Sequence, residues 1–325
     1  RWSRRRSLPW RRPRSLGARL FHGRRRLMRV AVTGASGLIG SALVPALRSQ
    51  GHEVVRLVRR APAAADEVRW DPASGEVDLA GLAGVDGIVH LAGAGVGDHR
   101  WTDAYKAEIL NSRVQGTDTI ARAAAVLDPQ PAVLVSGSAI GFYGDTGDRA
   151  VDASAPQGAG FLADVVAAWE AAAAPAVDAG IRVPFARTGL VVSSKGGAWK
   201  RILPIFKAGL GGRIGSGRQY WSYISLRDEV AALITLLTND QYAGPVNLTA
   251  PVPVTNSEVT KAMGEVLGRP TLLPVPSIAL KVALGEFSAD VLGSQRVLPA
   301  VLEGTGFTWS DPSIASAIEQ AVAGN

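Results

Sequence analysis

The stretch MRVAVTGASGLIG, residues 28–40, decides how the rest of the chain is interpreted. Residues 30–32 are typical of a buried strand, and residues 38–47 carry apolar side chains at helical spacing. Glycine permits positive φ and a close approach of the backbone to a ligand, and the N-terminus of a following helix attracts anions. The sequence therefore predicts a phosphate-binding turn between the strand and the helix. Its glycines are Gly34, Gly37 and Gly40.

The spacing of these glycines is G-x-x-G-x-x-G, whereas the usual dinucleotide fingerprint is G-x-G-x-x-G, so the surrounding sequence has to support the interpretation. A second apolar strand, HEVVRLV at 52–58, follows the helix at the distance expected for a β-α-β unit. In this context a bound nucleotide explains the glycines better than the alternative, a purely structural turn.

Strands and helices continue to alternate along the chain. Short β-branched runs predict strands near 85–91, at 132–136 and at 181–187, and apolar periodicity predicts helices near 102–127 and 161–175. This alternation predicts an α/β fold, a Rossmann-type doubly wound parallel sheet with helices on both faces.

The chain changes character near residue 190, where glycine-rich loops and proline-separated short helices begin. We therefore expect an NAD(P)-binding Rossmann domain at 28–190, followed at 191–325 by a smaller C-terminal lobe for the substrate. In doubly wound proteins the ligand lies at the carboxyl ends of the strands, so such a lobe would cover the cofactor cleft.

The positive charge of the chain is concentrated in residues 1–27. This leader holds 11 arginines and no acidic residue, and the formal net charge of +7 for the whole chain leaves −4 for the remainder. Three interpretations stay open: a start-site artefact, since Met28 opens the first strand, a targeting segment, or a disordered arm that binds nucleic acid. Outside the leader we expect no nucleic-acid partner.

The composition excludes several kinds of site. The chain has no cysteine, which rules out disulfides, thiolate metal sites and cysteine nucleophiles. The four histidines have no ligand-like spacing, so we expect no metal site. No apolar run is long enough to span a membrane, and we expect a cytoplasmic protein with no membrane partner. The oligomeric state stays open.

Two arginines end the second predicted strand, in LVRR at 57–60. An acidic residue at this position binds the ribose 2′-hydroxyl of NAD, whereas positive charge suits the 2′-phosphate of NADP. Arg59 and Arg60 therefore predict NADP(H) as the cofactor. The alternative is a pair of solvated loop arginines.

Four segments together resemble the extended short-chain dehydrogenase/reductases: TGASGLIG at 33–40, HLAG at 90–93, VSGSAIGFYG at 135–144 and GSGRQYWSYISLRD at 215–228. More narrowly, the chain is similar to a branch of nucleoside-diphosphate-sugar epimerase-like proteins that share a C-terminal segment. The resemblance implies a seven-stranded Rossmann-type sheet with NADP(H) bound at its edge.

The resemblance also implies which residues hold the cofactor. The glycine turn would bind the pyrophosphate, the two arginines the adenosine phosphate, and HLAG would line the adenine and ribose. Glu108 and Arg113, on one predicted helix, and the segment RTGLV at 187–191 would border the rest of the cofactor. The alternative for HLAG is a place in the strand core, and the alternative for Glu108 and Arg113 is an exposed pair on the helix. The implied residues are Gly34, Ser36, Gly37, Leu38, Ile39, Gly40, Arg59, Arg60, Leu91, Ala92, Gly93, Glu108, Arg113, Arg187 and Val191.

The catalytic residues of this superfamily are only partly present. The chemistry uses a serine that polarises a carbonyl, a tyrosine that transfers a proton and a lysine four residues later. Ser138 matches the serine, but the chain contains no Y-x-x-x-K, and Leu162 and Val166 stand where the pair would fall. Tyr143 is the nearby phenol that could replace the missing acid; a packing or positioning role is the alternative.

Basic and aromatic residues are interleaved between Asp178 and Asp228, with no acidic residue among them. Such a cleft suits an anion with a flat ring, for example a nucleotide-sugar, and a lid over the cofactor phosphates is the alternative. We therefore expect an NADP(H)-dependent oxidoreductase or epimerase with a small anionic substrate, or else a cofactor-binding sensor with little catalysis. The residues are Lys195, Lys200, Arg201, Lys207, Arg213, Arg218 and Arg227, with Trp199, Phe206, Tyr220, Trp221 and Tyr223.

Overall fold

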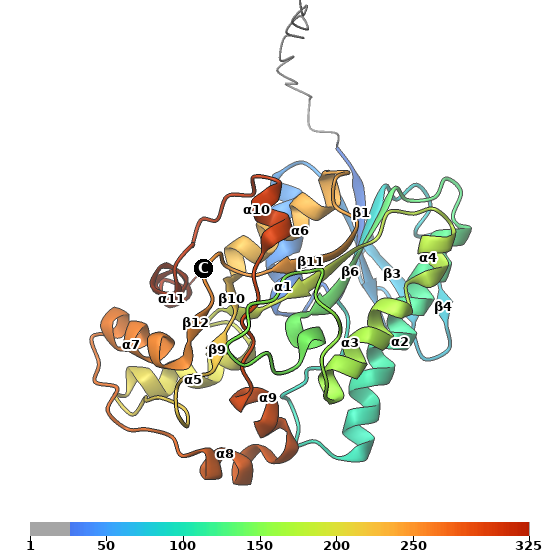
Figure 1. Cartoon of the computed structure of the whole chain (residues 1–325). Coiled ribbons are helices and arrows are strands. Elements are labelled where there is room, and N and C mark those ends of the chain that lie inside the picture. The colour runs from blue at the N-terminus through green and yellow to red at the C-terminus, as the bar shows by residue number, and fades with distance from the viewer. Residues whose placement is uncertain (1–26, 325) are drawn as a thin grey trace, which may run out of the picture.

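A parallel sheet with helices on both faces forms the larger part of the molecule (Figure 1). The computed structural model describes residues 27–324, so the interpretations of the basic leader lie outside the described residues. Within the described range, no helix has the length and apolarity needed to cross a bilayer. The same range contains no group of three or more histidine, aspartate or glutamate side chains placed to hold a metal ion.

Within residues 27–324 the main sheet has eight strands, in the order β11-β7-β6-β5-β1-β2-β3-β4. Seven of them run parallel, and the short edge strand β4 pairs antiparallel with β3. The predicted doubly wound sheet is therefore confirmed, with one short strand added. The strands are β1 (Arg29–Thr33), β2 (Glu53–Val58), β3 (Glu67–Asp71), β4 (Glu76–Val77), β5 (Gly87–His90), β6 (Val133–Ala139), β7 (Pro184–Thr188) and β11 (Gly244–Leu248).

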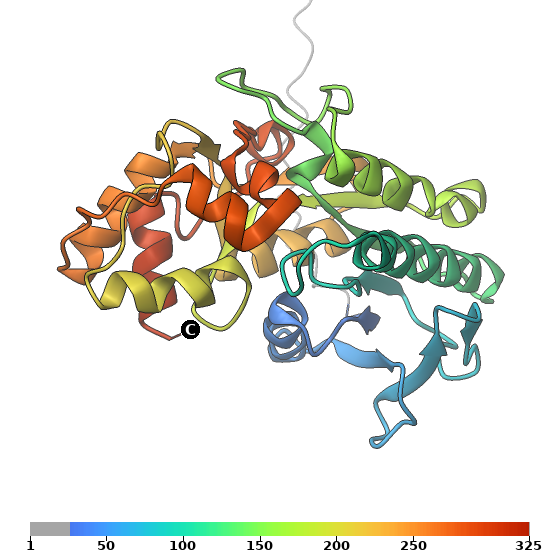
Figure 2. The same cartoon turned by 90° about the horizontal axis from the view of Figure 1, so that it is seen from below.

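Alternate side chains of the central strands pack on opposite faces of this sheet. Val30 and Val32 of β1 belong to the hydrophobic core under α1 (Leu38–Ser49) and α6 (Leu226–Thr238). Ala31 belongs to the core on the other face. That face is covered by α2 (Asp103–Val126) and α4 (Ala174–Asp178), with α3 (Phe161–Ala171) beside α2 (Figure 2).

The strand order reverses between β1 and β5, the neighbours at the centre of the sheet. From β1 the chain moves outward to β2 and β3, and then returns to β5 and continues to β6 and β7 on the other side. Ligands of open α/β sheets bind at the carboxyl ends of the strands at such a switch point. The glycine turn after β1 and the segment HLAG at the end of β5 both lie there.

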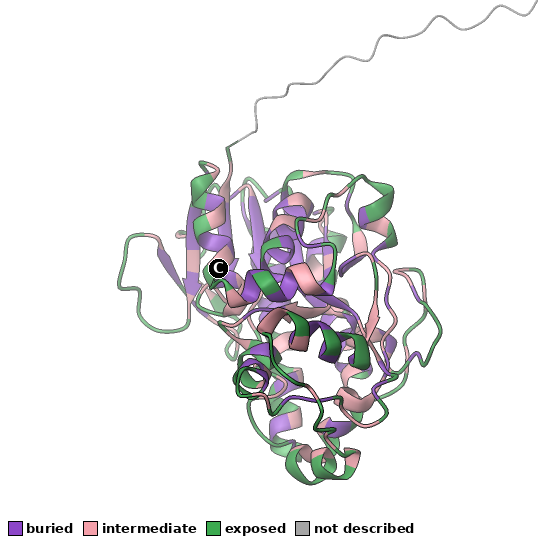
Figure 3. Cartoon of the chain, turned by 90° about the vertical axis from the view of Figure 1, so that its left-hand side faces the viewer, coloured by how far each residue is buried: buried purple, intermediate pink, exposed green. Residues whose placement is uncertain are grey.

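The C-terminal lobe packs beside the carboxyl ends of the strands (Figure 2). It has its own hydrophobic core, and its outer helices expose much of their surface, whereas the central strands are buried (Figure 3). Its helices are α5 (Gly197–Lys207), α7 (Asn256–Leu267), α8 (Ser277–Leu284), α9 (Ser288–Leu292), α10 (Ala300–Gly304) and α11 (Ile314–Val322). Two small sheets pair β8 (Leu190–Val192) with β10 (Tyr223–Ser225), and β9 (Tyr220–Trp221) with β12 (Val254–Thr255); the 3-10 turns are η1 (Ile140–Tyr143) and η2 (Gly285–Phe287).

The expected division of the chain at residue 190 is too simple. After the first part of the lobe the chain returns to the sheet, where α6 packs against α1 and β11 pairs with β7. The physical reason is that the apolar face of α6 and the run Val246–Leu248 complete the core of the sheet. Residues 191–325 therefore contribute to both the lobe and the Rossmann half.

A buried carboxylate ties the end of the chain to α6. Asp228 is fully buried and accepts hydrogen bonds from the backbone N–H groups of Ser310 (2.8 Å) and Asp311 (2.9 Å). Arg227 pairs with Asp311 at 2.6 Å. These contacts fix the segment before α11 against the Rossmann half.

Candidate cofactor and substrate site

Each of the three positions in the turn is occupied by glycine for a different structural reason. Gly34 has φ +65°, and a Cβ there would lie 2.8 Å from the backbone of Leu91; a Cβ on Gly40 would collide with the carbonyl oxygen of Gly34. Gly37 is exposed and, as the residue before α1, has no side chain to cap the first turn of the helix. The turn is therefore close-packed underneath and open above, with uncapped helix N–H groups, which fits a phosphate.

Thr33 joins the ends of β1 and β5. Its Oγ1 accepts hydrogen bonds from the N–H groups of Leu91 (3.0 Å) and Ala92 (3.2 Å) and lies 2.7 Å from Nδ1 of His90. Both lone pairs of this hydroxyl oxygen accept from backbone N–H groups, so its one hydrogen is left for Nδ1 of His90, which is the acceptor nitrogen in the tautomer with the ring proton on Nε2. Burial lowers the pKa of His90 to about 4, so this imidazole is neutral near pH 7. The segment HLAG is thereby fixed beside the glycine turn.

The two arginines that end β2 have different surroundings. Arg60 donates two hydrogen bonds to Glu67 (2.7 and 2.6 Å), whose side chain is 2% exposed. Hydrogen bonds from Arg60 and from the N–H of Ala63 lower the pKa of Glu67 to about 2. Arg59 is exposed and makes no hydrogen bond or ion pair with any residue of the described chain. Arg60 therefore closes the loop after β2, and Arg59 keeps an open guanidinium.

A buried ion pair lies behind Ser138, on β6. Ser138 donates its hydroxyl hydrogen to Glu170 (2.6 Å), and Arg187 binds both oxygens of the same carboxylate at 2.8 Å. Burial opposes the charge on Arg187, but the bonds to Glu170 outweigh it, so the pKa of Arg187 is raised. The Arg187 side chain is 4% exposed and faces the protein interior, not the cleft.

The hydroxyl of Tyr143 belongs to the same network. It accepts a hydrogen bond from Arg187 (2.9 Å) and donates one to Oδ1 of Asn247 (2.6 Å). Burial raises the pKa of Tyr143, although Arg187 opposes the shift. The side chain is 2% exposed, so this environment favours the packing or positioning role over proton transfer.

The positions that resemblance assigns to the acid–base pair lie one turn apart on α3. A Cβ on Gly141, which follows β6, would lie 3.5 Å from Cβ of Leu162 and 4.0 Å from Cγ2 of Val166. The aliphatic pair is thus beside the turn after Ser138, and neither side chain can transfer a proton.

Glu108 and Arg113 of α2 point in different directions. Glu108 is exposed, whereas Arg113 turns inward and donates from Nη1 to the carbonyl oxygens of Ala94 (2.9 Å) and Ile109 (3.0 Å). Burial lowers the pKa of Arg113 to about 10. Five positions on a helix differ by about 140° in direction, so the two side chains cannot act as one pair.

The basic and aromatic stretch does not form one cleft. Three of its five aromatic side chains are buried in the core of the C-terminal lobe, which corrects the prediction that they line the substrate site: Trp199, Phe206 and Tyr223. Arg227 is paired with Asp311, and Arg201 donates to the carbonyl oxygen of Gly97 (2.5 Å). These three side chains are buried because they lie on the inward faces of their helix or strand, where their apolar rings complete the hydrophobic core of the lobe.

The lobe meets the Rossmann half on both sides of the glycine turn. A Cβ on Gly196, before α5, would lie 3.2 Å from Cδ1 of Leu38 in the first turn of α1. On the other side Lys106 of α2 pairs with Glu286 of η2 at 2.9 Å. The ring centroids of Trp101 and Phe287 are 5.2 Å apart.

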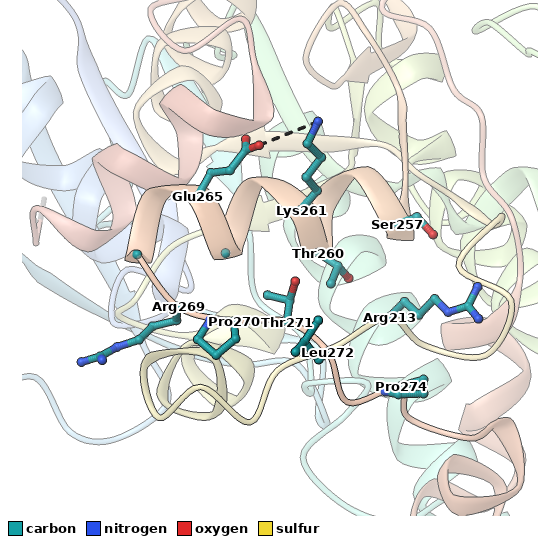
Figure 4. A pocket seen from close by; sticks show the side chains of 12 residues that line it. Arg213, Ser257, Thr260, Lys261, Glu265, Arg269, Pro270, Thr271, Leu272 and Pro274 are labelled. Carbon is teal, nitrogen blue, oxygen red and sulfur yellow. Dashed lines mark ion pairs between the residues drawn. The ribbon is translucent and has the colours of Figure 1, made fainter.

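A groove of about 750 Å³ lies on the lobe between α7 and the segment 268–274. Its basic side chains do not converge: Lys261 points toward Glu265 on the far side of α7 from Thr271, and Arg269 points outward (Figure 4). None of the residues that line this groove belongs to the glycine turn, to HLAG or to α1. The groove is therefore distinct from the switch-point site.

A doubly wound sheet with an open glycine turn at its switch point defines a dinucleotide-binding Rossmann protein. Residues 30–248 match the model of the NAD dependent epimerase/dehydratase family, and the chain belongs to that family. Residues 275–321 match a second model, a domain of unknown function (DUF1731). The expected membership of the extended dehydrogenase/reductases, with their C-terminal segment, is thus confirmed.

Relatives cover nearly the whole described chain. An epimerase family protein of Mycobacterium bovis is 47% identical over 293 residues, which are 90% of this chain and 97% of that protein. The crystal structure of human epimerase family protein SDR39U1 (isoform 2) with NADPH has a TM-score of 0.84 at 32% identity, covering 91% of this chain and 99% of that one. A nucleoside-diphosphate sugar epimerase structure from Corynebacterium glutamicum has a TM-score of 0.77 at 36% identity; the match covers 91% of this chain but 58% of the longer chain.

Proposed function

We propose that this protein binds NADP(H) at the switch point and is an oxidoreductase or epimerase-like enzyme for a small anionic substrate. The observation that carries the proposal is the open glycine turn beside HLAG, with the unpaired Arg59 at the end of the neighbouring strand β2. The NADPH in the structure of the human relative supports the same cofactor here.

Each part of the cofactor has a candidate partner in the chain. The N–H groups at the start of α1, at Leu38, Ile39 and Gly40, would bind the pyrophosphate with Ser36 and Gly37. Arg59 would bind the 2′-phosphate, and the segment 91–93 would line the adenine and ribose side. Bound NADP(H) supplies or accepts a hydride.

Proton transfer is the weak part of the catalytic apparatus. Ser138 gives its hydroxyl hydrogen to Glu170, so in this arrangement it can accept a hydrogen bond from a substrate but does not polarise a carbonyl. Tyr143 is held by Arg187 and Asn247. We infer slow turnover, with Ser138 as the candidate substrate contact.

A second candidate function is a NADP(H)-binding sensor with little catalysis. It is favoured by the aliphatic Leu162 and Val166 beside the site. Stopped-flow measurement of cofactor oxidation and reduction across a metabolite panel separates the two candidates, because a sensor would bind the cofactor and stay silent with every metabolite.

The class of substrate follows from relatives more than from the cleft. The relative from Corynebacterium glutamicum is described as a nucleoside-diphosphate sugar epimerase. We therefore include nucleotide-sugars among the anionic substrates to be tested.

Substitution of Arg59 tests the cofactor assignment. We expect the wild-type protein to bind NADPH at least about tenfold more tightly than NADH, a difference of about 1.4 kcal/mol, and Arg59→Ala to remove most of it. Isothermal titration calorimetry with both cofactors gives the ratio. Arg69→Ala is the matched control, since Arg69 is exposed on the next strand. Full discrimination in Arg59→Ala would contradict the assignment.

A further inference from the structure

The outer end of the C-terminal lobe exposes several large apolar side chains. Leu272 and Leu273 are 83% and 54% exposed, and Ile278 and Val282, one turn apart on α8, are 74% and 72% exposed. None of the eight residues of α8 is buried, and the helix lies at the lower edge of the molecule (Figure 1). Since a surface helix ordinarily buries one apolar side, α8 lacks a covering partner among residues 27–324.

These side chains come from segments that run side by side. The N–H of Gly215 donates to the carbonyl oxygen of Val275 (2.9 Å), and a Cβ on Gly212 would collide with the carbonyl oxygen of Leu273. The chain before α8 therefore lies along the glycine-rich segment that follows α5. Leu210 of that segment is also exposed, so the five apolar side chains belong to one part of the surface, and exposed apolar surface of this kind marks an interaction site.

The charge around these side chains has a single sign. The chain has no acidic residue at 179–227 or at 266–285, and the acidic residues at the ends of the second range, Glu265 and Glu286, are each paired with a lysine. Apolar side chains among unpaired cations are complementary to an anionic surface that also accepts apolar groups. The basic residues of these two stretches that lie nearest in sequence to the apolar side chains are exposed and form no ion pair with any residue of 27–324: Lys207, Arg213, Arg269 and Lys281.

We propose that this basic-apolar face, made of the five exposed apolar residues and the four cations, docks on an anionic lipid bilayer. Lysine and arginine are attracted to anionic headgroups, and exposed apolar side chains enter the boundary between headgroups and acyl chains. A protein partner would have to match the shape of the face, whereas lipids adapt to projecting side chains. The sequence-based expectation of no membrane partner considered spanning segments, and an interfacial contact requires none.

The test uses the full chain, into which a single labelled cysteine can be placed because the sequence has none. Leu273→Cys and Ile278→Cys carry the polarity-sensitive fluorophore NBD and are mixed with vesicles of phosphatidylcholine and phosphatidylserine. We expect a blue shift and a gain of NBD emission at both positions, because both enter the headgroup boundary. Val126→Cys is the matched control, since Val126 is 67% exposed but ends α2 in the Rossmann half, and its emission should not change.

Charge and apolar area give a second measurement. In the labelled Ile278→Cys protein, Lys281→Gln should raise the lipid concentration at the half-maximal shift about fivefold, because one attracted cation is lost. Replacement of both Leu272 and Leu273 by Ser should raise it about tenfold or more, because two apolar side chains no longer enter the boundary. Circular dichroism of each variant checks the fold, which these exposed positions should leave unchanged.

The local probe also separates this face from the basic leader, whose 11 arginines can bind anionic vesicles by charge alone. Vesicle binding without a blue shift at positions 273 and 278 would assign the binding to the leader and overturn the proposal. Equal shifts with vesicles of phosphatidylcholine alone would contradict the role of the cations. A blue shift that grows with protein concentration in the absence of vesicles would make a second copy of the chain the occupant, and no shift under any condition would leave the face to an acidic protein partner.

Discussion

Arg187 is buried and Arg113 is half-buried, and each stacks on an aromatic ring, but only the charge of Arg187 has an acidic partner among residues 27–324. The guanidinium carbon of Arg187 lies 3.5 Å from the Phe142 ring centroid, and its charge is neutralised by Glu170. Arg113 lies over Trp169 and has no acidic partner within the described chain. The charge of Arg187 is thus neutralised inside the protein, whereas that of Arg113 is left without an acidic partner among residues 27–324.

Removal of the Arg187 charge should give the largest effect. Arg187→Gln leaves Glu170 buried without its counter-ion, so we expect the free energy of unfolding to fall by about 3–5 kcal/mol. Arg113→Gln should lower it by less than Arg187→Gln does, because it leaves no buried counter-ion unpaired. Urea unfolding followed by circular dichroism measures both. The double variant Arg187→Gln with Glu170→Gln should regain much of the loss, and equal losses in the two single variants would break the comparison.

Glu229 extends the comparison to an acid, which can respond to burial by keeping its proton. It is fully buried with one oxygen bound by Thr188 (2.8 Å), and burial raises its pKa to about 8. Because the pKa of Glu229 is higher in the folded than in the unfolded protein, its protonated form stabilises the fold at low pH. This contribution to the free energy of unfolding is lost as the pH rises from the unfolded value toward 8. His90, with its lowered pKa, acts in the opposite sense below its unfolded value near 6.5.

Above pH 6.5 the contribution of Glu229 should therefore be visible. We expect the free energy of unfolding to fall by up to about 1.4 kcal/mol per pH unit between pH 6.5 and 8. Glu229→Gln should remove most of this slope in chemical unfolding measured across the same range. A slope that survives the substitution would show that another group causes it.

Tyr143→Phe should give a smaller effect than Arg187→Gln, because it removes one hydroxyl from the Arg187 network and leaves the ion pair. We expect a loss of about 1–2 kcal/mol, since the hydrogen bond to Asn247 disappears. Turnover of any substrate found by the metabolite panel should stay unchanged. A drop of about 10²- to 10⁴-fold in turnover would instead identify Tyr143 as the missing acid.

Local features of the sequence predicted the Rossmann half well. The glycine turn, the alternation of strands and helices and the missing Y-x-x-x-K are all readable within short segments, because they depend on backbone conformation and on spacing. The return of α6 and β11 to the sheet was not predicted, since their apolar runs fit equally well in a separate lobe.

The partners of charged residues were the main gap in the sequence-based prediction. Nothing near Arg60 or Arg187 in the sequence distinguishes an internal ion pair from a ligand contact. Glu67 and Glu170 reach them only after β3 and α3 have packed, as the side-chain distances show. The separate directions of Glu108 and Arg113 were in principle accessible from helical geometry.

The contacts of Asp228 bear on the order in which the protein can be completed during synthesis. The carboxylate belongs to a helix that covers the Rossmann sheet, but the N–H groups that satisfy it come from Ser310 and Asp311. A nascent chain that has just exposed β11 therefore still carries a charged group without its donors inside the forming core. The Rossmann half is thus completed only after the segment that holds Ser310 and Asp311 has been made.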